Sequence, residues 1–140
     1  MIATRRCHAL PRQGAARGRD GTALSRLDAA ARRDEMWLAR DIAAEKRDEI
    51  AEAADRKMAE LDAAFEECFG DLPVTAAEIV MRFGEHRKTA LKYREQAAAQ
   101  RALAAADRRA AAEDRLRAAH DRLLASAERE ALARELANTG

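Results

Sequence analysis

Along the first half of the chain, apolar side chains recur at spacings of three and four residues, which places them on one face of a helix. No glycine or proline interrupts residues 22–69. Because Gly costs about 1 kcal/mol and Pro about 3 kcal/mol inside a helix, this absence favours one continuous element. We therefore predict a long helical region over residues 22–69, with this apolar face: Leu38, Ile42, Ile50, Ala54, Met58, Leu61, Phe65 and Cys68.

The last part of the chain, residues 85–139, is also free of glycine and proline, but its leucines follow no sustained repeat. Leu116 and Leu123 are seven residues apart, whereas Leu123 and Leu132 are nine apart and fall on nearly opposite sides of a helix. A heptad seam of leucines is therefore not sustained. We predict an Ala-rich long helix over residues 97–140 that forms at most a weak, Ala-lined coiled coil.

Residues 1–21 differ from both of these parts. They contain Pro11, three glycines and scattered Arg residues, with no hydrophobic period. A segment with few large apolar residues and many charges cannot bury enough apolar surface to order itself. We predict that residues 1–21 are disordered. The alternative is a start of translation at Met36, which would leave this segment outside the natural protein.

Large apolar side chains are scarce in this chain. Almost half of its residues are nominally hydrophobic, but most of these are Ala, and there are only one Trp, one Tyr and three Phe. Burial contributes roughly 25 cal/mol per Å² of apolar surface, and Ala buries little area. The composition therefore predicts an elongated all-α protein that associates as a homodimer through its long helices. Trp37 is either a local packing anchor or an interface residue.

A short break separates the two long helical parts. Thr75 and Glu78 form the capping box T-x-x-E just before an apolar run, which predicts the start of a helix. Gly84 follows that run, and glycine readily adopts the positive φ that a chain reversal requires. We therefore predict a short helix over residues 75–83, a turn at Gly84 and a second short helix over residues 86–95.

This break resembles the helix-turn-helix of bacterial DNA-binding proteins, which has apolar residues early in its first helix, a glycine in its turn and two apolar positions in its second helix. Five residues carry the resemblance: Ile79, Phe83, Gly84, Ala90 and Tyr93. Glu85 and Val80 depart from the residue types usual at their positions. The resemblance implies a helix-turn-helix over residues 70–96 that reads duplex DNA, as in transcription regulators and plasmid or phage DNA-binding factors.

Charge is segregated along the chain, although the net charge is only +1. Residues 34–67 carry twelve acidic and five basic residues, whereas residues 82–94 carry five basic residues against Glu85 alone. DNA binding requires a basic patch of this kind on the helix that enters the major groove. Arg and Lys side chains can bond guanine edges or phosphates there. The predicted DNA contacts are His86, Arg87, Lys88, Thr89 and Lys92.

Other classes of function find little support in the sequence. No Ser/His/Asp or Cys/His arrangement, glycine-rich phosphate loop or set of zinc ligands is recognisable. We therefore expect no enzymatic activity, no cofactor, no metal and no small-molecule ligand. No apolar run of about 18 residues suggests a membrane-spanning helix. The two cysteines, Cys7 and Cys68, are too few for a disulfide scaffold, which favours the cytoplasm.

The alternative function is that of a helical coiled-coil scaffold, or a protein-interaction protein that binds no nucleic acid. The balanced charge of the Ala-rich C-terminal helix and the acidic character of the first helix suit contacts with proteins. This alternative gains support if Arg87, Lys88 and Lys92 pack against the acidic residues of segment 45–62, because the basic patch would then be neutralised within the chain.

Overall fold

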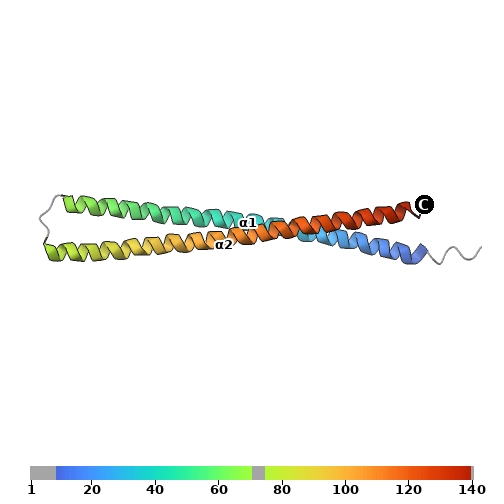
Figure 1. Ribbon diagram of the computed structural model, residues 1–140, viewed down its shortest axis with the longest axis horizontal. Coiled ribbons are helices and arrows are strands. Elements are labelled where there is room, and N and C mark those ends of the chain that lie inside the picture. The colour runs from blue at the N-terminus through green and yellow to red at the C-terminus, as the bar shows by residue number, and fades with distance from the viewer. Residues whose placement is uncertain (1–8, 71–74, 140) are drawn as a thin grey trace, which may run out of the picture. The chain divides into compact units, whose positions relative to one another are not determined.

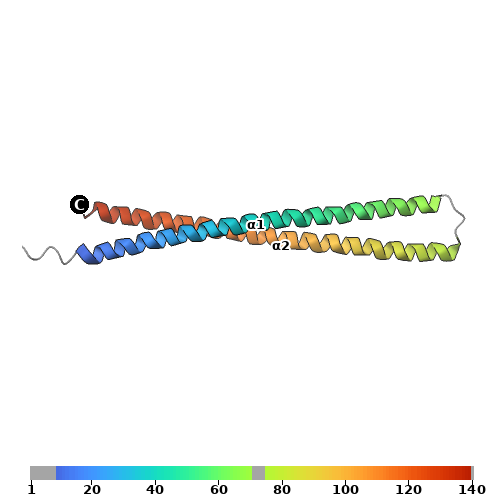
Figure 2. The same ribbon diagram turned by 180° about the vertical axis from the view of Figure 1, so that it is seen from behind.

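The computed structural model describes residues 9–70 and 75–139, and nearly all of them are helical. Helix α1 spans Ala9–Gly70 and helix α2 spans Ala76–Ala137, with no strand in these ranges. The predicted all-α fold with two long helical stretches is confirmed. The chain divides into two compact units, the first unit (Met1–Ala39 with Ala110–Gly140) and the second unit (Arg40–Arg109). Within each unit, a part of α1 lies beside an antiparallel part of α2 (Figure 1, Figure 2).

Helix α1 begins earlier than the glycine pattern predicts. Residues 9–21 are helical, so the predicted disorder is wrong for them, whereas residues 1–8 lie outside the described residues. A Cβ atom at any of the three glycines in this stretch would meet nothing within 4 Å, so each glycine costs only its low helix propensity. Arg19 in the same stretch forms an ion pair with Glu135 of α2, which helps to hold this part of α1 against its neighbour.

Helix α2 begins at the predicted capping box. The backbone N–H of Thr75 donates to Oε2 of Glu78 at 3.2 Å, and the backbone N–H of Glu78 donates to Oγ1 of Thr75 at 3.3 Å. These two reciprocal bonds satisfy backbone donors that the first helical turn leaves without partners. The predicted helix start is therefore confirmed.

The turn predicted at Gly84 is absent, because α2 is one continuous helix and no described glycine has a positive φ. The two short helices expected on either side of Gly84 are parts of this single helix. The ring of Phe83 lies 4.9 Å from that of Phe65 on α1, and the ring of His86 stacks on Phe65 at 4.2 Å. These contacts on both sides of Gly84 help to offset the cost of about 1 kcal/mol for one helical glycine.

Alanines spaced seven residues apart, or a multiple of seven, fill the seam between the two helices. No large side chain among the described residues is fully buried, whereas these alanines are at most 5% exposed. In the first unit they are Ala23, Ala30, Ala111, Ala118 and Ala125, and in the second unit Ala44, Ala51, Ala90, Ala97 and Ala104. A methyl side chain lets two helix axes approach to the lower end of the usual range of roughly 8–10 Å. The repeat that the leucines do not sustain is therefore carried by alanine.

Trp37 stands where the seven-residue repeat of the α1 seam would place another alanine. Its indole Nε1–H donates to Oδ1 of Asp34 at 3.1 Å, and the guanidinium carbon of Arg115 lies 4.2 Å from the ring centroid. A cation over an indole face is attracted by the negative charge of the π system. Of the two roles predicted for Trp37, the structure therefore shows local packing within the first unit.

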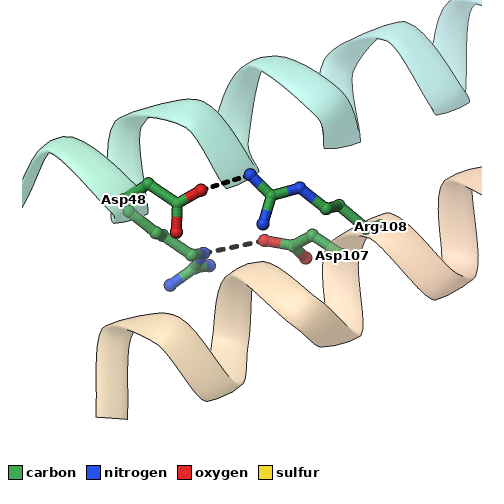
Figure 3. A network of polar contacts seen from close by, with 4 residues as sticks. Asp48, Asp107 and Arg108 are labelled. Carbon is green, nitrogen blue, oxygen red and sulfur yellow. Dashed lines mark hydrogen bonds and ion pairs between the residues drawn. The ribbon is translucent and has the colours of Figure 1, made fainter. Parts of the chain in front are cut away.

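Ion pairs between the helices follow both sides of the alanine seam. In the second unit these pairs include Arg47–Asp107 and Asp48–Arg108 (Figure 3), together with Asp55–Arg101. Nε of Arg47 donates to Oδ2 of Asp107 at 2.7 Å. The hydrogen bond from Arg108 to Asp48, together with the negative charge of that carboxylate, raises the pKa of Arg108. Arg47 and Asp48 are thus adjacent on α1, and they pair with two adjacent residues of α2 that carry the opposite charges, Asp107 and Arg108.

The first unit repeats this arrangement with its own residues. Four pairs link α1 to α2: Arg19–Glu135, Arg26–Glu128, Arg33–Asp121 and Asp34–Arg122. Along the first three pairs, each step of seven residues forward on α1 matches a step of seven residues backward on α2. This matching defines an antiparallel register for the two helices within the unit.

Replacing Ala97 with Leu tests the close approach at the seam. Ala97 is 1% exposed and packs with Ala51 and Ala54 of α1, so three extra carbon atoms must push the helices apart. We expect the free energy of unfolding to fall by about 1–3 kcal/mol, measured by urea denaturation followed by circular dichroism. The matched control is Ala99→Leu at an exposed position of the same helix. Equal stability of the two variants would contradict a tightly packed seam.

A double-mutant cycle on Arg47 and Asp107 tests the ion pairs beside the seam. Their side chains are 34% and 26% exposed, so we expect a coupling free energy of about 0.2–1 kcal/mol at low salt. The coupling should shrink as salt screens the charges. The control cycle uses Glu52 and Arg56, an exposed pair within α1. A coupling of zero for Arg47 and Asp107 at low salt would show that this pair does not link the helices in solution.

Candidate functional site

The five residues predicted to contact DNA lie near the start of α2, in the second unit, and the structure gives them different environments. Arg87, Lys88 and Lys92 are exposed and form no ion pair with any residue that the structure describes. Among the described residues, no ion pair therefore joins them to the acidic segment 45–62.

His86 and Thr89 are already engaged within the chain. Nε2 of His86 lies 2.8 Å from Oδ1 of Asp62, its ring stacks on Phe65, and its side chain is only 16% exposed. The hydroxyl of Thr89 donates to the backbone carbonyl oxygen of Glu85 at 3.1 Å. These two residues contribute to packing and to local helix structure, so the accessible basic set is smaller than the predicted one.

Arg94 extends this accessible basic set and was not among the predicted contacts. Its position continues the seven-residue series of Arg101 and Arg108, which pair with aspartates of α1. Arg94 itself is exposed and forms no ion pair in the described part of the chain. It lines a surface depression together with Arg87 and Lys88, beside His86, Ala90 and Leu91. Cations gathered in this way attract phosphate or carboxylate groups.

A second candidate surface lies on the outer side of α2 in the first unit. Leu116 and Leu123 are 73% and 71% exposed, although leucine is among the most often buried residue types. Leu124 and Ala131, which lie nearer to α1, are half-buried, and Ala127 is exposed. The spacings of three and four residues place all of them on one face of α2. We call this set the outer apolar face.

The outer apolar face could have been predicted from the spacing of the alanines, but not from the spacing of the leucines alone. The alanine repeat shows which side of α2 faces α1, and Leu116 and Leu123 each lie two residues before a seam alanine, almost on the opposite side of the helix. Their spacing of seven is therefore a second repeat, separate from the seam. Reading the alanines and the charged residues at intervals of seven would have identified both.

No group of three or more His, Cys, Asp or Glu side chains within residues 9–70 and 75–139 is placed to hold a metal ion. Neither described helix has a stretch that is long and apolar enough to cross a membrane. Cys68 is exposed and forms no disulfide. Two candidate surfaces among the described residues are thus the basic surface near the start of α2 and the outer apolar face.

No protein-family model, curated protein or solved structure matches this chain. Its function is therefore inferred from these two surfaces.

Proposed function

We propose that this chain is a helical interaction protein, without enzymatic activity, that binds other helices through its outer apolar face. One observation carries the proposal: the large side chains Leu116 and Leu123 are exposed, whereas the seam between α1 and α2 is filled by alanine. Burying a leucine side chain contributes about 1.5–3 kcal/mol, and this stabilisation is unused in the isolated chain. Contiguous exposed apolar residues of this kind mark surfaces that bind other proteins.

The charge distribution of the first unit supports the same function. Arg26 and Arg33 pair with acidic residues of α2 beside the seam, so these charges are satisfied within the unit. The outer apolar face has its own charged neighbours, which pair only along α2: Glu113 with Arg117 and Glu130 with Arg134. Such exposed pairs within one helix contribute only about 0.3–0.5 kcal/mol, so a partner helix can compete for them at little cost.

Replacing both exposed leucines tests this proposal. The variant Leu116→Gln/Leu123→Gln should change the free energy of unfolding by less than about 0.5 kcal/mol per site, because neither side chain is packed within the chain. Its affinity for helical partners should fall by about tenfold or more per leucine. Chemical cross-linking in an extract of the producing cell, followed by gel analysis, measures the loss of cross-linked species.

The matched control is Ser126→Gln/Ala133→Gln, which changes two exposed residues of the same helix, also seven apart, that lie roughly a quarter turn around α2 from Leu116 and Leu123. This control should retain the cross-linked species of the wild-type chain. An absence of cross-linked species in the wild type, or an equal loss in both variants, would contradict the proposal.

DNA binding is the second candidate function, in the cytoplasm and through the exposed basic surface of α2 instead of a separate reading helix. The observation in its favour is that Arg87, Lys88 and Lys92 are exposed and carry no ion pair with the described residues, with Arg94 beside them. Lys and Arg side chains neutralise phosphates and release counterions from duplex DNA. This role fits a transcription regulator or a plasmid or phage factor that contacts the DNA backbone.

Fluorescence anisotropy with a labelled mixed-sequence duplex tests DNA binding. If this candidate function holds, binding at low salt should weaken steeply with added salt, with a slope of log K against log[salt] of about −0.9 per phosphate contact. The variant Arg87→Ala/Lys88→Ala/Lys92→Ala should bind more weakly and with a shallower slope. The charge control is Arg109→Ala/Arg129→Ala, at two exposed positions further along α2. Wild-type affinity in the triple variant would exclude this surface as a DNA contact.

A further inference from the structure

The outer side of α2 in the first unit has a residue pattern that reads alike in both directions from its centre. The centre lies between Leu123 and Leu124, and on this side most positions at equal distances from it carry matching residue types or opposite charges. From the centre outward the pairs of positions are Leu123 and Leu124, His120 and Ala127, Arg117 and Glu130, Leu116 and Ala131, Glu113 and Arg134, and Ala110 and Ala137. Apart from Ala127, which mirrors His120, apolar positions mirror apolar ones, and both acidic positions mirror basic ones.

We infer that the partner of the outer apolar face is a second copy of this chain. The two α2 helices pack antiparallel about a two-fold axis that passes between Leu123 and Leu124. In such an isologous contact, residues equally far from the axis lie level with each other on the two helices. The inference rests on the proposed function and names the partner that this surface binds.

The apolar centre of this contact consists of Leu123 and Leu124. Leu123 is 71% exposed and Leu124 beside it is half-buried. At the axis both residues meet their equivalents in the partner subunit, which brings four leucines together. Leu116 lies level with Ala131 of the partner subunit on each side. Leu116 and Leu123 do not take part in the alanine seam and are exposed in one chain, but in this contact they become buried against apolar residues of the partner subunit.

The charged residues around this centre favour a second copy over a helix of arbitrary sequence. Glu113 lies level with the partner's Arg134 near the middle of the contact, so the symmetry creates two pairs of opposite charge. In one chain the same residues form only the pairs Glu113–Arg117 and Glu130–Arg134, at 3.6 and 3.3 Å, with side chains 63–76% exposed. Opposite charges across an interface fix its register and disfavour other partners.

Charge reversal with rescue tests this contact, with sedimentation equilibrium as the measurement. We expect the wild-type chain to self-associate and each single variant, Glu113→Arg or Arg134→Glu, to weaken self-association by about tenfold, because each places like charges level at two symmetric positions. The double variant Glu113→Arg/Arg134→Glu should recover wild-type affinity. In this double variant, residue 113 and the residue 134 level with it in the second copy again carry opposite charges, although the pairs Glu113–Arg117 and Glu130–Arg134 along α2 are lost.

Circular dichroism of every variant confirms that helix content is kept, as expected for exposed side chains. A further variant, Leu123→Gln, changes no charge and should also weaken self-association. A wild-type chain that stays monomeric up to about 1 mM would overturn the inference, because that concentration detects even very weak association. Failure of the double variant to recover affinity would also overturn it.

The two proposals fail in different ways. If the wild-type chain is monomeric but its cross-links to other proteins are lost in Leu116→Gln/Leu123→Gln, the second copy is the wrong partner and the interaction function survives. If the wild-type chain forms no cross-linked species of any kind, both fail. Self-association that responds to Glu113 and Arg134 as described supports both.

Discussion

The close approach of two helices along an alanine seam is the constraint on which the rest of this structure depends. Each seam residue contributes a single methyl group, so the seam permits a short distance between backbones but stabilises it little through apolar burial. The charged residues beside the seam therefore decide how the helices align. A half-exposed ion pair contributes little net free energy, but a shift of the helices by one residue would place Arg47 beside Arg108 and Asp48 beside Asp107. Arg47 opposite Asp107 and Asp48 opposite Arg108 encode this choice.

The sequence predicts the helices of this protein well and the contacts between them poorly. The capping box of Thr75 and Glu78 depends on residues three apart, so their spacing alone reveals it. The prediction of a turn at Gly84 was wrong because Phe83 and His86, on either side of Gly84, both contact Phe65 of the other helix. An Ala-lined contact was predicted for the C-terminal helix, but the alanines that form the seam were not identified, because alanine is also abundant at exposed positions.

For the candidate site, the sequence predicts which residues carry charge but not which charges stay accessible. Arg87 and Lys88 are exposed, as a DNA contact requires. His86 is not available in the same way, because its partners Asp62 and Phe65 come from a segment more than twenty residues away. The outer apolar face was equally hidden, since the side of α2 that Leu116 occupies is known only once α1 is placed beside it.

Because the ion pairs recur every seven residues, the contact between the two helices can be extended in steps of seven residues. In the first unit, Arg19, Arg26 and Arg33 each meet an acidic residue in the same way. Seven residues added to both helices at matching levels would preserve every existing pair, and slippage by one such step would also bring opposite charges together. A periodic interface alone is therefore degenerate in alignment. Residues that break the repeat remove this degeneracy. Trp37 contacts Arg115 only in the observed alignment, so this contact distinguishes it from an alignment shifted by seven residues.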